Sequence, residues 1–517
     1  MIYHRKIRHT KEITMNTRTD EQRAQNAQIK LCDKVTYCEL SNDYTLPDYQ
    51  PEIRRVLRVS ASVLPASKYV SGSRAELGGT VDYHLLYVAS DGKLYSAPLA
   101  SEYELSAPLD IDPRVDLGEG ITLLANVTAD NETARVSAPR KINIKCRVNA
   151  DVRAYGTITL DELISGEAET NSIQRLSREC RSDYVSAGVS ETRDILAEFD
   201  TVSDGMRVID SNAELLITDA YIDSRGAKCK GELRIELFVC NENTDGEPTC
   251  LRKSIPFEDS VELDGELEYC VARGYVSDIK VNVEDGKIIC EASVFCEVTA
   301  HAGKTVIYTK DIYSTERFCE TAQKQQTLFT PLYCAVSNFS QSERMELSEG
   351  QTAIGATTVG CYCSALSDDC IFSDGKYIVS GNCKYTVIAR KDGEYFCFDQ
   401  TLPFKYEFAS GNEHSCAHVR VHPSSAMARI DGNLLCLDAE LYVCAELSKE
   451  FSISTLSEAR FGEELNKKCG DMIVCYPTPD DTLWSVSKKY RIPSISLDGI
   501  SDPEAKLDGV DYLIVNF

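Results

Sequence analysis

The side chains best suited to chemistry follow one another at every second position of a short stretch, as His414, Cys416 and His418. Imidazole nitrogen and thiolate sulfur are ligands that zinc prefers, so these three residues form a candidate metal site. A strand over 413–421 would bring all three to one face, because side chains alternate along a strand. Residues two apart on a strand lie about 6.5 Å from each other, which is too far for neighbours to share one ion easily. We therefore expect a solvent-facing strand here, with no metal and no other cofactor.

The chain has 22 cysteines among its 517 residues, which raises the same question on a larger scale. No Cys-x-x-Cys pair occurs, so the spacing of a zinc ribbon is absent. Cys290 and Cys296 take apolar positions in an alternating stretch, as small buried hydrophobic residues would. Most cysteines are therefore expected to be reduced core residues, and exposed ones could cross-link if the protein later meets an oxidising environment.

The motifs of common enzymes are missing. No Gly-x-Ser-x-Gly, no Walker glycine loop and no His-Glu-x-x-His occurs, and only seven histidines are present from which to build a catalytic triad. The 55 Lys and Arg against 81 Asp and Glu give a formal net charge of -26, with no basic stripe of the kind that neutralises phosphate groups. We therefore expect neither an enzyme nor a nucleic-acid-binding protein. The lack of a secretory leader and of an apolar run of about 18 residues predicts a cytosolic chain without a transmembrane segment.

The pattern along most of the chain is that of β-structure. Short segments in which apolar and polar residues alternate are separated by turns rich in Asp, Asn and Gly. Four landmarks recur in order three times: a glycine that opens a strand, a turn, an aromatic residue 11 positions after the turn glycine, and a second turn. The landmarks are Gly79, Asp91-Gly92, Tyr103 and Asp130-Asn131, then Gly231, Asp245-Gly246, Phe257 and Asp285-Gly286, then Gly381, Asp392-Gly393, Phe404 and Asp431-Gly432. We predict a mainly β fold with three tandem β-sandwich-like repeats.

These landmarks divide the chain into successive parts. We predict a basic flexible N-terminal tail over 1–30, β domains over 31–157, 201–302 and 328–450, a polar linker over 451–471, and a different module over 472–517. Alternation fades over 158–200 and 303–327, which we interpret as boundaries between the β domains. Met15 begins a more ordinary soluble sequence, so translation could start at Met1 or at Met15.

The last 46 residues follow another pattern. Strands are predicted over 472–476 and 512–515, with a helix from Thr482 to Tyr490 between them whose last turn carries lysines that suit the helix dipole. The run Asp481-Thr-Leu-Trp-Ser485, followed by Leu497 and Gly509, resembles a LysM domain. The resemblance implies a small βααβ module of the kind that binds N-acetylglucosamine polymers.

Asp480 stands where the LysM family usually has glycine, and an acidic residue there favours a protein partner over a neutral sugar. We predict that the module contacts its partner through one face around the start of the helix. That face comprises Asp480, Asp481, Thr482, Leu483, Trp484 and Lys488. Trp484, the single tryptophan, could stack on a sugar ring, but a semi-buried helix residue is the more common role in a small module.

The run Leu46-Pro-Asp-Tyr-Gln-Pro-Glu-Ile53, followed by Gly79 and Tyr87, resembles the SPOCS-type domain of spore-forming Firmicutes. Tandem SPOCS-type domains followed by one LysM domain resemble the clostridial spore-coat morphogenetic proteins that interact with the coat-basement ATPase. The resemblance implies a non-enzymatic adaptor in the mother-cell cytosol, which tethers that ATPase at the forespore surface and meets other coat proteins. The alternative is a peptidoglycan- or N-acetylglucosamine-binding protein that acts through LysM at the cortex or the cell wall. The oligomeric state and the partner of each β domain stay open.

Overall fold

The structure is a computed structural model of the chain. It describes residues 26–516 except 117–119, 161–171, 201–204, 244–247, 285, 331–332, 349–351, 411–412, 415, 466–471 and 494–501. The fold is mainly β, as predicted. The predicted N-terminal tail lies outside the described residues as far as residue 25. Residues 26–30 of the predicted flexible tail instead form the start of a strand, because they pair with residues 155–159. Ala27 is only 2% exposed there.

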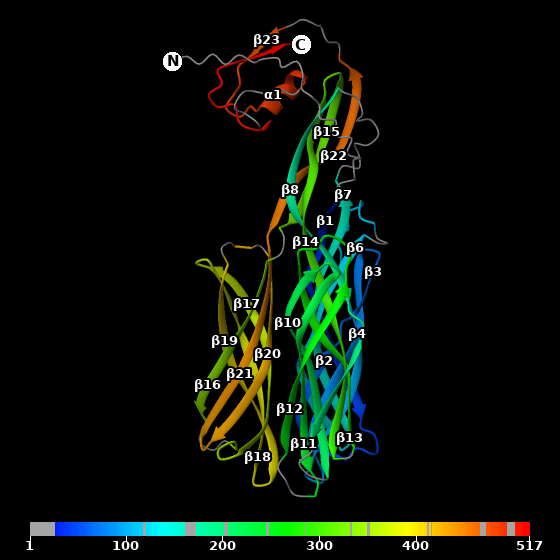
Figure 1. Cartoon of the computed structure of the whole chain (residues 1–517), viewed down its shortest axis with the longest axis vertical. Coiled ribbons are helices and arrows are strands. Elements are labelled where there is room, and N and C mark those ends of the chain that lie inside the picture. The colour runs from blue at the N-terminus through cyan, green and yellow to red at the C-terminus, as the bar shows by residue number, and fades with distance from the viewer. Residues whose placement is uncertain are drawn as a thin grey trace.

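The first β unit, which we call unit 1, consists of two antiparallel sheets in the described part of residues 26–159 (Figure 1). In one sheet the order is β1-β7-β6, and in the other β4 pairs with β2, β3 and β5. Apolar side chains of both sheets meet between them, and Tyr83, Leu85 and Val148 are almost wholly buried there. The strands are β1 (Asn26–Thr45), β2 (Ile53–Val63), β3 (Ser67–Ser71), β4 (Arg74–Ala89), β5 (Leu94–Pro108), β6 (Ile121–Ala138) and β7 (Lys141–Thr159).

Unit 2 has the same kind of arrangement. The sheet β10-β11-β12 faces a sheet in which β14 pairs with β13, β9 and β8. Leu233 and Val294 are wholly buried between these sheets. The strands are β8 (Ile173–Val189), β9 (Arg193–Asp200), β10 (Met206–Asp223), β11 (Gly226–Asn241), β12 (Thr249–Glu262), β13 (Tyr269–Glu284) and β14 (Lys287–Ser314).

Unit 3 lies beside the other two units in Figure 1 and also pairs two sheets, of order β17-β18-β19 and β16-β21-β20. Tyr385 and Leu437 are wholly buried between them. The strands are β16 (Tyr333–Glu346), β17 (Thr357–Ser373), β18 (Lys376–Lys391), β19 (Glu394–Ala409), β20 (Cys416–Asp431) and β21 (Leu434–Ser448).

The glycine and aromatic landmarks are cross-strand partners in all three units. Little space is left for a side chain at two of these glycines. A Cβ at Gly79 would lie 2.8 Å from the Tyr103 hydroxyl oxygen, and a Cβ at Gly381 would lie 2.7 Å from Cζ of Phe404. In units 1 and 3 the glycine therefore makes space for the aromatic ring on the next strand, whereas a side chain at Gly231 would meet the backbone of Leu216 first. The pairs are Gly79 with Tyr103, Gly231 with Phe257, and Gly381 with Phe404.

The turn landmarks agree less uniformly with the structure. Asp91-Gly92, Asp392-Gly393 and Asp431-Gly432 join consecutive strands of hairpins. Asp130-Asn131 does not: β6 continues through it with a bulge, and the hairpin turn comes at Pro139-Arg140. Asp245-Gly246 and Asp285 lie outside the described residues.

Strands also run through the stretches that we predicted as boundaries and linker. They form an extension that we call the stalk, which comprises residues 173–185 of β8, residues 303–314 of β14, β15 (Arg317–Phe329) and β22 (Glu450–Glu464) (Figure 1). β15 pairs with β22, and β8 pairs with β14 as far as the tip. Ile312 and Leu456 are buried between the two pairs of strands. Residues 311–314 of β14 are buried one after another, whereas β15 and β22 have long exposed stretches, so neither shows regular alternation. The rest of the predicted linker, residues 466–471, lies outside the described residues.

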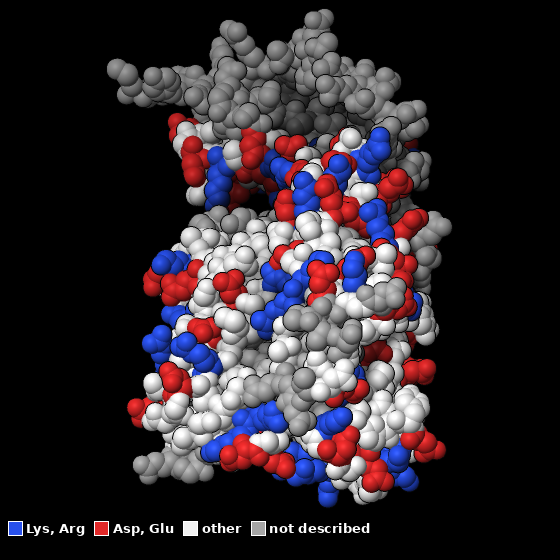
Figure 2. All heavy atoms as spheres, turned by 60° about the horizontal axis from the view of Figure 1, so that its bottom comes forward, with Lys and Arg blue, Asp and Glu red and all other residues white. Residues whose placement is uncertain are grey.

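The C-terminal module lies at the tip of the stalk (Figure 1). β23 (Met472–Cys475) pairs antiparallel with β24 (Leu513–Asn516), and α1 (Leu483–Tyr490) lies between them in the chain. The described part of the module contains this one helix, and residues 494–501 lie outside it, so the second helix of the expected βααβ order stays a prediction. No helix among the described residues is long and apolar enough to cross a lipid bilayer. Over the described surface visible in Figure 2, Lys and Arg are interspersed with Asp and Glu.

Candidate functional site

The start of α1 is held by local hydrogen bonds of two residues of the predicted partner face. The Thr482 hydroxyl accepts a hydrogen bond from the Ser485 amide at 3.0 Å, and the Thr482 amide donates to the Ser485 hydroxyl at 2.9 Å, which makes a capping box. The Asp481 carboxylate accepts from the amide and the hydroxyl of Thr478 at 2.8 and 2.9 Å, and these bonds lower its pKa. Asp481 and Thr482 thus shape the module itself.

Two further residues of the predicted face point in different directions. Leu483 is 2% exposed and packs with Val486 and Leu513 in the core of the module. Asp480 lies in water, with its side chain 90% exposed, and pairs with Lys506 at 2.9 Å. The six residues therefore do not form one continuous binding surface.

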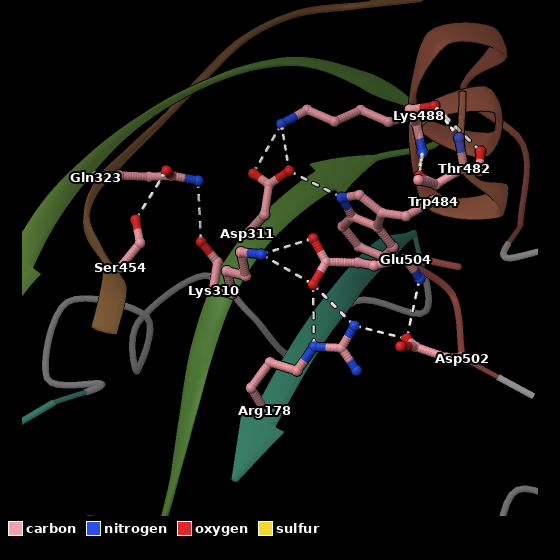
Figure 3. A network of polar contacts seen from close by, with 11 residues as sticks. Arg178, Lys310, Asp311, Gln323, Ser454, Thr482, Trp484, Lys488, Asp502 and Glu504 are labelled. Atoms are coloured by element: carbon pink, nitrogen blue, oxygen red, sulfur yellow. Dashed lines mark hydrogen bonds and ion pairs between the residues drawn. The ribbon is translucent and has the colours of Figure 1, made fainter. Parts of the chain in front are cut away.

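Trp484 and Lys488 face the stalk (Figure 3). The Trp484 side chain packs on Tyr313 with ring centroids 4.9 Å apart and belongs to a buried cluster with Leu176. Its Nε1 donates a hydrogen bond to Asp311 at 2.8 Å, and the Lys488 ammonium lies 2.7 Å from both oxygens of the same carboxylate. One carboxylate of β14 therefore holds two residues of α1.

A second set of charges joins the module to the stalk beside the first. The Glu504 carboxylate accepts hydrogen bonds from Arg178 at 2.8 Å and from Lys310 at 2.7 Å, and Asp502 accepts from Arg178 at 2.6 Å (Figure 3). Burial opposes ionisation of Glu504, but the two cations outweigh it and lower the pKa of its carboxyl. We call the two sets of contacts together the dock: acidic residues of the module meet basic residues of the stalk, and Asp311 meets an indole and an ammonium group.

The sequence pointed to the module side of the dock but not to the stalk side. Asp311 is 8% exposed and follows a register shift after Thr309 in the β8–β14 ladder. A bulge of this kind re-aims the side chains that follow it. The charged pair Lys310-Asp311 interrupts a mostly apolar stretch over Val306–Tyr313, and that interruption is a local signal that could have singled out Asp311, though not its partners in the module.

The three β units meet around a cavity of about 870 Å³ that is lined by both apolar and charged residues, which we call the junction. It is lined by β1, β6 and β7 of unit 1, by β10 and β13 of unit 2, and by β17, β20 and β21 of unit 3. Glu446 and Arg153 are both almost wholly buried and lie 2.8 Å apart, and Arg420 contacts the other carboxylate oxygen of Glu446. Burial opposes ionisation of Glu446, but the two guanidinium groups outweigh it and lower the pKa to about 2. This ion triad joins unit 1 to unit 3.

Histidine–carboxylate pairs also cross from unit to unit. Each of the three combinations of units has at least one such pair among the described residues. They are His84 with Asp210 between units 1 and 2, His422 with Glu214 between units 2 and 3, and His418 with both Asp33 and Asp151 between units 3 and 1.

Of the candidate metal site, the structure describes the side chains of His414 and His418, and these two have separate partners. The His414 amide donates to the Tyr377 hydroxyl at 2.7 Å, and Cys416 is the first residue of β20, with a side chain outside the described part. His418 lies instead beside Asp151, at 3.3 Å, and Asp33, at 3.7 Å. In the part of the chain that the structure describes, these three form the one group of His, Cys, Asp and Glu close enough to share a metal ion. The sequence identified His418 but not its neighbours, which come from distant strands.

Comparisons with known proteins add no relative. No family model matches the chain, and comparison with curated proteins and with solved structures finds no match. The functional conclusions therefore rest on the residues and contacts described above.

Proposed function

We propose that this chain is a non-enzymatic structural adaptor of spore-coat assembly, which tethers the coat-basement ATPase at the forespore surface in the mother-cell cytosol. The observation that carries the proposal is the dock, which fixes a small terminal module on a stalk continuous with unit 2. An adaptor holds two partners at a set separation. A paired β scaffold with a docked module can do so because the module keeps one position relative to the body.

The three β units, in this proposal, are SPOCS-type repeats and the module is a LysM domain. The support for repetition is the glycine that faces an aromatic ring across neighbouring strands in each unit. In units 1 and 3 a larger residue in place of the glycine would meet the ring, so the arrangement needs both residues at once. Its recurrence at matched spacing supports a common origin of the units.

The ATPase-binding face of the module, in this proposal, lies on the side away from the stalk. Trp484 and Lys488 are engaged in the dock, whereas Tyr476 is 73% exposed and Val474 is 44% exposed. Tyrosine is enriched at protein–protein interfaces. We therefore assign partner contact to Tyr476, Val474 and Asp480, and the holding of the module to Trp484 and Lys488.

Capture of the purified coat ATPase by the immobilised full-length chain tests this proposal. We expect retention at micromolar concentration, and we expect Tyr476→Ala to weaken it by about tenfold or more, as for an interface anchor. Glu458→Gln, an exposed charge on the stalk, is the matched control and should leave retention unchanged. No retention by the unaltered chain would overturn the adaptor proposal. If retention depends on Trp484 but not on Tyr476, the ATPase instead binds the face that was predicted from the sequence around the start of α1.

The alternative, binding of N-acetylglucosamine polymers at the cortex or wall, requires a sugar to reach Trp484. That side chain is 6% exposed and packed on Tyr313, so a sugar could stack on it only after the module leaves the dock. Titration of the full-length chain with chitooligosaccharide, followed by Trp484 fluorescence, distinguishes the two functions. Unchanged emission supports the adaptor, and saturable quenching supports the glycan-binding protein.

A further inference from the structure

Asp33 of β1, Asp151 of β7 and His418 of β20 bring three potential metal ligands together at the junction. One ligand atom from each residue lies within 4.8 Å of the other two. Nδ1 of His418 is 3.3 Å from Asp151, and Nε2 is 3.7 Å from Asp33. Ligand atoms at about 2.0–2.2 Å from one ion lie roughly 3 Å from each other, so the imidazole ring and the carboxylates would have to rotate for one nitrogen and both carboxylates to share an ion.

One carboxylate of the set is oriented by a neighbouring cation. Lys30 holds one oxygen of Asp33 at 2.5 Å, while the other oxygen faces His418. Outer contacts of this kind orient the ligating groups of metal sites.

A second, independent observation points to a ligand at the same place. His301 is 2% exposed, and its Nδ1 lies 2.7 Å from the Asp183 carboxylate, whereas its Nε2 has no hydrogen-bond partner among the described residues. His301 lines a small cavity together with Asp33 and His418, and the cavity has a volume of about 10 Å³. That volume is close to what one water molecule needs. A histidine whose other nitrogen is bonded to a carboxylate is the usual arrangement at metal sites.

We propose that Asp33, Asp151 and His418 bind one divalent transition-metal ion, with a metal-bound water in the small cavity facing Nε2 of His301. Two carboxylates and one imidazole suit Mn²⁺ or Zn²⁺. The ligands come from units 1 and 3, and His301 comes from β14. The ion would therefore link units 1 and 3 directly and β14 through its bound water. This structural role goes beyond the proposed adaptor function and does not depend on it.

Mn²⁺ is the probe of choice because the 22 cysteines would bind Zn²⁺ at other positions, whereas Mn²⁺ prefers oxygen and imidazole ligands. Metal-free full-length chain is titrated with Mn²⁺, and free Mn²⁺ is measured by electron paramagnetic resonance. We expect one saturable site per chain and an unfolding temperature several degrees higher with Mn²⁺ bound. His418→Gln and Asp151→Asn should each weaken the affinity at least tenfold.

His422→Gln is the matched control, because His422 lies on the same strand and lines the junction but contacts Glu214 instead. It should leave Mn²⁺ binding unchanged. Equal loss of binding in His422→Gln and His418→Gln, or the absence of a saturable site in the unaltered chain, would overturn the proposal and identify His418 as a simple bridge between two carboxylates. Asp33→Asn, checked for folding by circular dichroism, provides the same test if Asp151→Asn does not fold.

Discussion

The indole Nε1 of Trp484 donates a hydrogen bond to the Asp311 carboxylate at 2.8 Å. The donor belongs to the C-terminal module and the acceptor to the stalk, and the same carboxylate also holds Lys488. Removing the acceptor of a buried charged hydrogen bond costs more than the bond contributes, because the donor stays buried without a partner. Asp311 is therefore the residue whose loss should disturb the dock most.

Asp311→Ala should release the module from the stalk. We expect a cost of about 2–3 kcal/mol, since both Trp484 and Lys488 lose their acceptor. Because Trp484 is the single tryptophan of the chain, its emission reports the dock directly and should shift to longer wavelength when water reaches the ring. Asp480→Ala, at an exposed carboxylate, is the control and should leave the emission unchanged. An unshifted spectrum in Asp311→Ala would contradict the docked arrangement.

Glu446→Gln should destabilise the junction. The substitution leaves Arg153 almost wholly buried without its counter-charge, and loss of one partner of a buried ion pair costs about 3–5 kcal/mol. Chemical denaturation of the full-length chain measures this as a lower midpoint of the transition that includes units 1 and 3. Glu440→Gln, at an exposed position of the same strand, should change the midpoint little. Equal effects of the two substitutions would show that the triad contributes no special stability.

The contribution of Glu446 should also depend on pH. Its folded-state pKa of about 2 is below the ordinary value for Glu, so its stabilising effect is fully present above the ordinary pKa and is lost as the pH falls toward 2. The difference in unfolding free energy between the unaltered chain and Glu446→Gln should therefore be constant above about pH 5 and shrink below it. Denaturation at a series of pH values measures this difference. A difference that grows with acidity would have the wrong sign for this triad.

Gly381→Ala should destabilise unit 3. The new Cβ would clash first with the backbone carbonyl oxygen of Leu366 and would also lie 2.7 Å from the Phe404 ring, and overpacking of this kind costs about 1–3 kcal/mol. Gly360→Ala in the same sheet is the control, because the nearest atom to its Cβ is 3.7 Å away. Thermal unfolding should show a clearly lower midpoint for Gly381→Ala alone. Similar midpoints for both variants would contradict the close packing of Gly381 against Leu366 and Phe404.

Local features of the fold were predictable from the sequence because neighbouring residues encode them. The start of α1 follows from Thr482 as a cap, and its buried face follows from Leu483 and Val486 three positions apart. Contacts between distant strands are not encoded in this way. Trp484 and Asp311 are 173 positions apart, and Arg153 and Glu446 are 293 apart. No periodicity tells which strands of different units will lie side by side, so the dock and the junction needed the structure.

Asp130-Asn131 illustrates how a local signal can have two structural meanings. Asn131 has a positive φ of 56°, the left-handed conformation that hairpin turns often require. Here the same conformation belongs to a bulge, and β6 continues beyond it. The predicted turn at Asp130-Asn131 was therefore wrong, because residues after the bulge still pair with β7 and the chain turns only after β6 ends.

The length of β14 has a mechanical consequence. This 28-residue strand pairs with β13 inside unit 2 and with β8 as far as Ser314 at the tip. A force applied to the docked module along the stalk passes through Asp311 into β14, which is hydrogen-bonded to a neighbouring strand along its whole length. The hydrogen bonds between β8 and β14 then resist this force in shear, many at once rather than one after another. The stalk therefore transmits force to unit 2 through one continuous strand.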